Sequence, residues 1–536
     1  MTGFIRNPSL SRRSLTKAAG GAAAAGIMAR RGMPAQAQAT PEAGTSTVSA
    51  DTVQGAIAQL EPMITDALAK TGVPGLAVGI VFQDELIYAK GFGVRSVDAA
   101  DAVDPETVFQ LASVSKSLAS TAVSTVVTSG EITWDDQVVT HLSDFEMSDP
   151  WVTREVTLRD CFSHRTGMYG TAGDDLESIG FGRDEIIQRM RYLDLTGKFR
   201  QTYSYSNFGL TLGGEAAAEA VGLTWEDLCD QRLYGPLGMT SSSSRYADFA
   251  AQSNRAELHV QVDGVWTQML ERHPDAQSPA GGASSNIVDM ATWVRMVLGN
   301  GSIDGTELIA PEVLLDTHTP QIVSNIDPAT GRANFYGLGW VVTYDATGRI
   351  YFSHAGAFSV GARTLIHLLP DEQLGVVVLS NAFPTGVPEA IAYSFYDLVH
   401  DGAVSRDWLD HWDTMFDAYT NAYPAIIAAY ATPPADAAPA LPLAAYAGTY
   451  ANDYFGPLQI TVAGDALTMA IGPGPKTYAL DHWDRDVFVF DAIPEAPGVK
   501  STVSFLIDDT SNGSALTVQA FEGYGQGTFT RVPDVG

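Results

Sequence analysis

The chain has 536 residues, a length that predicts two or three domains rather than one core. An apolar content of 45% and an aromatic content of 10% are typical of a well-packed globular protein and exclude a disordered or fibrous chain. Acidic residues outnumber basic ones by 62 to 31, and the formal net charge of −31 opposes binding to nucleic acid or to anionic membranes.

The first 39 residues resemble a twin-arginine export signal. A basic segment at 11–17 contains two adjacent arginines, an Ala/Gly run follows at 18–29, and small residues at 35–39 offer cleavage sites. The run is too short to span a bilayer, and a second arginine pair at 30–31 interrupts it. We therefore expect export to the periplasm or the outside of the cell without a stable membrane anchor. An unprocessed basic tail is the alternative.

The segment 40–51 is a polar spacer, and the patterns after it indicate a domain over 52–400. Apolar residues at three- and four-residue steps predict a helix over 53–68, and a β-hairpin follows at 76–89. A second pair of apolar strands lies at 363–379, near the end of the domain. These patterns predict an α/β (α+β) fold, in which a central antiparallel sheet is built from both ends of the domain and flanked by helices, with a helical region inserted between.

The last part of the chain differs in kind. A helical stretch and a Pro/Ala-rich linker occupy 401–442, and short strands separated by turn residues follow over 443–534. The clearest strands are 458–462, 466–469, 487–490 and 502–506. Their spacing predicts a small antiparallel sheet or β-barrel.

Ser113 and Lys116 are the first candidate pair for chemistry. Three residues apart on a helix, they lie one turn apart on the same face, so that the lysine nitrogen can reach the serine oxygen. The small apolar residues that follow, 118–123, predict a buried helix, and burial disfavours a charged lysine, which could then accept a proton. Spacing alone is a weak signal, because Ser14 and Lys17 in the signal segment show it too.

Two further elements could serve the same site. Tyr205 could relay a proton from the serine, and Asn207, two residues on, could hold a substrate carbonyl. At the end of a strand-like run, His354 offers a hydrogen-bonding side chain and Gly356 lets substrate approach the backbone. Structural roles remain the alternative, because Tyr-x-Asn recurs in this chain and a lone histidine is commonly structural.

The three elements occur in the order of a known set of motifs. They resemble the Ser-x-x-Lys, Tyr-x-Asn and Lys/His-x-Gly motifs of class C β-lactamase-like serine hydrolases, a penicillin-binding-protein-like group of the peptidase S12 type. Segments between the motifs resemble the family as well: 161–168, 235–239, 280–282, 336–340 and 379–381. The resemblance covers about residues 52–385 and implies a β-lactamase/transpeptidase-like fold.

The resemblance also implies a mechanism. Ser113 would attack a carbonyl while Lys116 and Tyr205 accept its proton, and the acyl-enzyme would then be hydrolysed by water. Which of the two acts as the base stays open. The backbone N–H groups of Ser113 and Ala357 would form the oxyanion hole.

The same resemblance assigns Asn207, His354 and Gly356 to substrate binding and leaves His164 and His367 as structural residues. Class C β-lactamases have lysine where this chain has His354. Histidine is mostly neutral near pH 7 and does not supply a constant charge for an antibiotic carboxylate. This departure favours an esterase or a peptidase over an efficient β-lactamase.

Three functions remain open from the sequence. The first is a serine hydrolase for ester or amide bonds of small or peptide-like acyl substrates; the second is a β-lactamase, D,D-peptidase or D-aminopeptidase; the third is a penicillin- or acyl-binding protein without turnover. The segments 446–450 and 480–483 resemble a lipocalin-like domain appended to such hydrolases. We expect no cofactor, no metal site and no nucleic-acid partner, while the oligomeric state and a bridge between Cys161 and Cys229 stay open.

Overall fold

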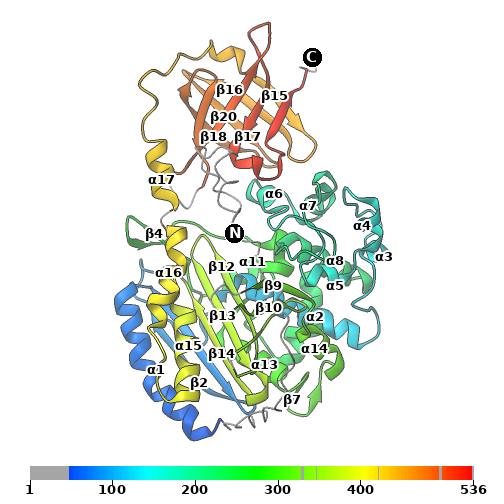
Figure 1. Ribbon diagram of the computed structural model, residues 1–536, viewed down its shortest axis with the longest axis vertical. Helices are drawn as coiled ribbons and strands as arrows, with labels where there is room; N and C mark the ends of the chain where they lie inside the picture. Colours follow the sequence, from blue (N-terminus) through cyan, green and yellow to red (C-terminus); the bar gives the residue numbers. More distant parts are fainter. Residues whose placement is uncertain (1–47, 327–330, 346, 421, 494–497, 534–536) are drawn as a thin grey trace, which may run out of the picture. The chain divides into compact units, whose positions relative to one another are not determined.

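The computed structural model describes residues 48–326, 331–345, 347–420, 422–493 and 498–533 (Figure 1). The expected signal at 1–39 and most of the spacer at 40–51 lie outside the described residues. Everything from residue 48 onward belongs to one unit, so the two domains described below share contacts. Among the described residues, no helix combines the length and the apolar character needed to cross a membrane.

An eight-stranded antiparallel sheet forms the centre of the first domain, in the order β2-β1-β14-β13-β12-β11-β10-β9. Strand β1 from the start of the domain pairs with β14 from its end, with Val78 opposite Val378. This confirms the predicted sheet built from both ends of the domain. The strands are β1 (Gly75–Phe82), β2 (Glu85–Gly93), β9 (Ile322–Ile326), β10 (Ala333–Tyr336), β11 (Val341–Tyr344), β12 (Ile350–Phe358), β13 (Ala362–Leu369) and β14 (Leu374–Ser380).

Helices cover both faces of this sheet, as Figure 1 shows. Strand β1 is buried along its whole length, and its side chains alternate between two cores. Leu76, Val78 and Ile80 pack in the core that includes α1 (Ala50–Thr71) and α15 (Val387–Asp401). Ala77 and Val81 belong to the core on the other face, which includes α2 (Ser115–Thr128) and α13 (Ile287–Leu298).

The predicted helical region lies between β2 and β9 and consists of short helices. They are α3 (Val138–His141), α4 (Pro150–Glu155), α5 (Leu158–Phe162), α6 (Asp174–Ser178), α7 (Arg183–Arg189), α8 (Asn207–Ala220), α9 (Trp225–Cys229), α10 (Gly235–Leu237), α11 (Tyr246–Ala251) and α12 (Ser278–Gly281). Helix α14 (Pro311–His318) follows α13. Two-stranded pairs join β3 (Phe109–Gln110) to β6 (Ser284–Ser285), β4 (Val260–Val262) to β5 (Val265–Thr267) and β7 (Ser302–Ile303) to β8 (Thr306–Glu307).

The C-terminal domain is a closed barrel of eight antiparallel strands, drawn in orange and red in Figure 1. Helices α16 (Trp408–Thr420) and α17 (Ala422–Ala429) precede it. Its strands are β15 (Gly448–Asn452), β16 (Gly456–Ala463), β17 (Ala466–Ile471), β18 (Lys476–Asp484), β19 (Val487–Asp491), β20 (Lys500–Ile507), β21 (Gly513–Val518) and β22 (Thr528–Arg531). Tyr446, Phe488 and Phe505 lie within 6 Å of one another, ring centre to ring centre, in its aromatic core. The sequence thus predicted the barrel.

A buried carboxylate fixes the loop that leads to the functional site. Asp160 has no exposed surface, and it accepts hydrogen bonds from Arg165 Nε at 2.7 Å and Arg200 Nη2 at 2.8 Å. It also accepts from the Thr157 hydroxyl at 3.0 Å, which caps helix α5. Two arginines from separate segments therefore converge on one carboxylate.

Replacing the charge of Asp160 tests this arrangement of two arginines on one carboxylate, called the clamp below. We expect Asp160→Asn to lower the free energy of unfolding by about 2 to 4 kcal/mol, since it leaves two guanidinium groups facing a neutral amide. The control is Asp135→Asn, at an exposed carboxylate that pairs with Arg159 and is worth less than about 1 kcal/mol. Urea unfolding followed by circular dichroism measures both, and equal losses would contradict the clamp.

Candidate functional site

Ser113 lies in a single 3₁₀ turn, Ala112–Val114, that leads directly into α2. The sequence predicted a helix for this serine, and the difference arises at Ala112, whose φ of +48° is left-handed. The turn leaves Ser113 partly exposed, whereas the first twelve residues of α2 after it are buried. The neighbouring Ser115 faces away and accepts a hydrogen bond from the Ala283 N–H.

Gly356 allows strand β12 to pass directly against this turn. A Cβ atom on Gly356 would lie 2.2 Å from the carbonyl oxygen of Leu111 and 3.0 Å from the amide nitrogen of Ser113. Thr364 of the neighbouring strand donates to the same Leu111 carbonyl at 2.6 Å. The sequence assigned this glycine to the approach of substrate, and in the structure the protein's own backbone requires a glycine here as well. The contact brings the Ser113 N–H next to the strand that carries Ala357.

Lys116 is fully buried, and its Nζ atom has three polar neighbours. The nitrogen lies 2.8 Å from Asn207 Oδ1, 2.8 Å from the Ala280 carbonyl oxygen and 3.1 Å from Ser113 Oγ. Burial lowers the pKa of Lys116 to about 7, against the opposing charge of Asp174. A neutral lysine amine has two N–H groups and one lone pair. Its N–H groups donate to the oxygens of Asn207 and Ala280, and its lone pair can accept a hydrogen bond from the Ser113 hydroxyl.

Tyr205 also belongs to this centre. Its ring centre lies 4.6 Å from Lys116 Nζ. Burial raises the pKa of Tyr205, against the opposing effect of the Ser113 side chain, so the phenol keeps its proton near neutral pH. Asn207 begins helix α8, which Ser206 caps by accepting from the Gly209 N–H. The helix start therefore sets the position of the asparagine.

His354 is held by the protein itself. Its Nδ1 atom lies 2.9 Å from the Ala355 carbonyl oxygen and its Nε2 atom 2.8 Å from the Tyr336 hydroxyl. Burial lowers the pKa of His354 to about 3, so the ring is neutral. A carbonyl only accepts, so Nδ1 donates to it and Nε2 accepts from Tyr336. The histidine expected to orient substrate thus has both nitrogens engaged and carries no charge.

The sequence left His164 as a structural residue and did not single out Asp174, Tyr336 or Ala280, which also surround this centre. His164 Nδ1 accepts from the Ser206 N–H at 3.1 Å, and its ring lies 4.4 Å from that of Tyr205. Both carboxylate oxygens of Asp174 accept from Asn207 Nδ2, at 3.2 and 3.3 Å, and burial raises the pKa of Asp174 to about 7. Tyr336 and Ala280 lay in segments that already resembled the family; Asp174 had no signal in the sequence.

Other candidates take no part in the centre. Cys161 and Cys229 are free and buried, so they do not form the bridge that the sequence left open. His367 is enclosed by the rings of Tyr351, Tyr393 and Tyr396. Within the part of the chain that the structure describes, no three His, Cys, Asp or Glu side chains gather in a way that could hold a metal ion.

With this geometry in place, the comparison with known families is informative. Residues 60–400 match the family described as Beta-lactamase. The chain belongs to the β-lactamase family. It is a serine hydrolase that acts through an acyl-enzyme. Residues 432–528, which include the barrel strands β15 to β21, match a domain of unknown function (DUF3471).

Three similar proteins share only a low sequence identity with this chain. An unguisins hydrolase of Aspergillus campestris is 26% identical over 436 residues, covering 75% of this chain and 77% of the relative. Penicillin-binding protein 4 of Amycolatopsis lactamdurans is 28% identical over 324 residues, or 58% of this chain and 81% of that protein. The octameric penicillin-binding protein homologue of Pyrococcus abyssi shares the fold, with a TM-score of 0.58 at 20% identity, over 89% of this chain and all of the other.

The tight contact at Gly356 gives a test of the site geometry. We expect Gly356→Ala to reduce kcat for an activated ester by about 100-fold or more. The added carbon must displace the Ser113 turn by up to about 1 Å, and a displacement of this size in a catalytic group is costly. The control is Gly55→Ala on exposed α1, where nothing lies within 4 Å of the new carbon. Steady-state kinetics and thermal unfolding are measured together. Full activity in folded Gly356→Ala would contradict this role.

Proposed function

We propose that Ser113 is the nucleophile and that Lys116, rather than Tyr205, is the base that activates it. The observation that carries the proposal is the surroundings of the lysine nitrogen. Two acceptor oxygens occupy its N–H groups, and the remaining neighbour is the Ser113 hydroxyl. The raised pKa of Tyr205 keeps that phenol protonated, which suits a donor rather than a base.

The reaction then runs in two halves. Ser113 Oγ bonds to the acyl carbon as its proton moves to Lys116, and the N–H groups of Ser113 and Ala357 stabilise the negative oxygen. The bond to the leaving group breaks as Tyr205 gives it a proton, and the phenol is reprotonated from Lys116. Water then attacks the acyl-enzyme with the same groups in reverse roles and releases the acid and the free serine.

We propose uncharged esters and peptide-like amides as substrates. The neutral, internally bonded His354 supports this, since it offers no cation to a substrate carboxylate. The similarity to an unguisins hydrolase supports a peptide-like amide. The similarity to penicillin-binding protein 4 favours the second candidate, a D,D-peptidase or β-lactamase. We also propose export, which the basic, Ala-rich N-terminus supports.

Intact-mass spectrometry of the exported protein tests the nucleophile. After incubation with an activated ester, and separately with benzylpenicillin, we expect hydrolysis of the ester or one added acyl mass in the wild type and neither in Ser113→Ala. Ser129→Ala, at the end of α2, is the control and should match the wild type. The untreated mass also tests export, since cleavage near Thr40 is expected.

The outcome separates the three open functions. Turnover of the ester alone supports the proposal, turnover of benzylpenicillin supports the second candidate, and an acyl mass that persists for hours supports a binding protein. Unchanged reactivity of Ser113→Ala would overturn the assignment of the nucleophile.

The pH dependence tests the base. A lysine acts as a base only when deprotonated, so we expect kcat/KM for an uncharged ester to rise with pH and level off above about 7, the pKa of Lys116. His354 adds no inflection between pH 5 and 8, because it is neutral throughout. Lys116→Arg should lose activity by at least about 1000-fold, since arginine stays protonated. A rate independent of pH from 5 to 9 would contradict Lys116 as the base.

A further inference from the structure

The segment 173–175 connects the barrel to the helical region. Tyr454, in the turn between β15 and β16, is fully buried. Its hydroxyl donates to Asp175 Oδ1 at 2.7 Å and accepts from the Gly173 N–H at 3.1 Å. One phenol of the barrel therefore holds both ends of this three-residue segment.

The middle residue of the segment points to the catalytic centre. Asp174 accepts from Asn207 Nδ2 at 3.2 and 3.3 Å, and Asn207 Oδ1 in turn accepts from Lys116 Nζ at 2.8 Å. Asn207 thus bridges the carboxylate of Asp174 and the lysine. A continuous chain of hydrogen bonds and adjacent residues runs from Tyr454 of the barrel to Ser113.

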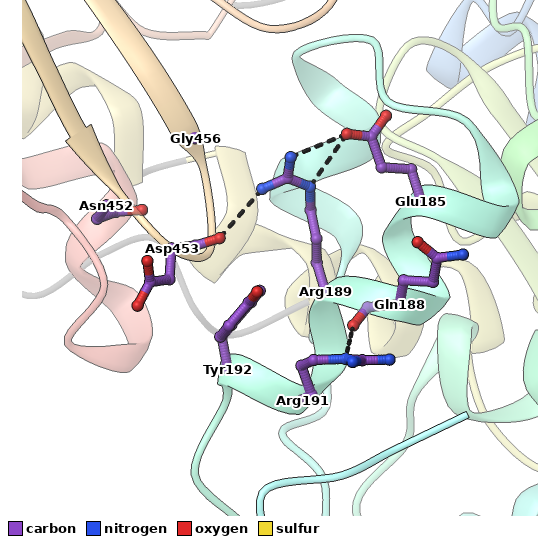
Figure 2. Close-up of a pocket in the computed structure, with 8 residues that line it drawn as sticks. All are labelled: Glu185, Gln188, Arg189, Arg191, Tyr192, Asn452, Asp453 and Gly456. Atoms are coloured by element: carbon purple, nitrogen blue, oxygen red, sulfur yellow. Dashed lines mark hydrogen bonds and ion pairs between the residues drawn. The ribbon is translucent and has the colours of Figure 1, made fainter. Parts of the chain in front are cut away.

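The surroundings keep both the segment and the tyrosine in place. Gly173 has a φ of +87°, and a Cβ there would lie 2.7 Å from Ile186 and 2.8 Å from Phe208, so these side chains pack closely against the backbone of the segment. Figure 2 shows the second anchor of the same barrel turn, Arg189. Its Nη1 atom donates to the carbonyl oxygens of Asp453 at 3.1 Å and Tyr454 at 2.8 Å.

We propose that the barrel is a positioning part of the active site: Tyr454 fixes segment 173–175 so that the Asp174 carboxylate holds Asn207, and through it Lys116, beside Ser113. This inference rests on the proposed role of Lys116 as the base. It makes Tyr454 and Asp174 positioning residues, since neither touches the reacting atoms.

The charge of Asp174 gives the arrangement a measurable effect. A carboxylate near a buried amine favours the ammonium form, so Asp174 raises the pKa of Lys116 while burial lowers it. Because Asp174 titrates in the same range, the two groups share apparent pKa values. The other titratable groups that face this pair are Asp175, Glu177, His164, His354, Tyr205 and Tyr524.

The small number of lysines makes the pKa of Lys116 directly measurable. The full chain has seven lysines, and one of them, Lys17, lies in the proposed export signal. A spectrum of the cleaved protein labelled with ¹³Cε-lysine therefore contains six signals, and Lys116→Arg identifies the one of interest. We would titrate this signal in the wild type, Asp174→Asn, Tyr454→Phe and the double variant. Asp174→Asn keeps an acceptor for Asn207 and removes only the charge.

We expect both single variants to shift the pKa of Lys116 downward by about half a unit or more. Tyr454→Phe should produce no further shift when Asp174→Asn is already present, because its effect passes through that charge. The matched control is Tyr450→Phe, which removes a hydrogen bond to the Tyr446 carbonyl inside the barrel and should leave the Lys116 signal unchanged.

Three results would overturn the inference. The pKa of Lys116 could be unchanged in Tyr454→Phe. Tyr454→Phe could shift that pKa as much when Asp174→Asn is present as when it is absent, or Tyr450→Phe could shift it as much as Tyr454→Phe does. The titration needs no substrate, so its result is separate from the acylation experiment on Ser113→Ala. If the pKa values shift as expected while Ser113→Ala stays fully reactive, the positioning holds and the proposed nucleophile fails.

Discussion

The arrangement of the candidate site depends on the burial of the Lys116 amine. A lysine without solvent contact is costly to keep charged, and its hydrogen-bonding atoms must all find partners inside the protein. Lys116 meets that requirement with Asn207 and Ala280, which lie 91 and 164 residues further along the chain. Helices α8 and α12 of the inserted region supply these partners. The helical insertion between the two halves of the sheet therefore completes the buried environment that lowers the pKa of the lysine.

The sheet supplies the second constraint. The turn at Ser113 begins with a left-handed alanine, and such a conformation persists only where the surroundings enforce it. Here the enforcement comes from β12 and β13, which approach the turn through Gly356 and the Thr364 hydroxyl. The Ser113 turn and the strands beside it are thus held together by direct contact. A substrate carbonyl meets a preorganised site rather than a flexible loop.

The sequence predicted what depends on local pattern. The hairpin over 76–89, the strand pair over 363–379 and the barrel follow from periodicity and turn residues, and they are confirmed. The residues around the serine could be named because their motifs occur in a fixed order, though the engagement of His354 with Tyr336 could not be read from it. Asp174 escaped notice because its contact with Asn207 is set by tertiary packing.

The same low-dielectric environment acts differently on each group of the centre. It removes the charge of His354, keeps the proton on Tyr205 and brings the pKa of Lys116 to neutrality. In the proposed mechanism, the lysine lies between a hydroxyl that must lose a proton and a phenol that can pass one on. A fixed cation at position 354 would oppose the charge on Lys116, and in this chain a neutral ring hydrogen-bonded to Tyr336 takes that place. The neutral ring at position 354 therefore adds no positive charge beside Lys116.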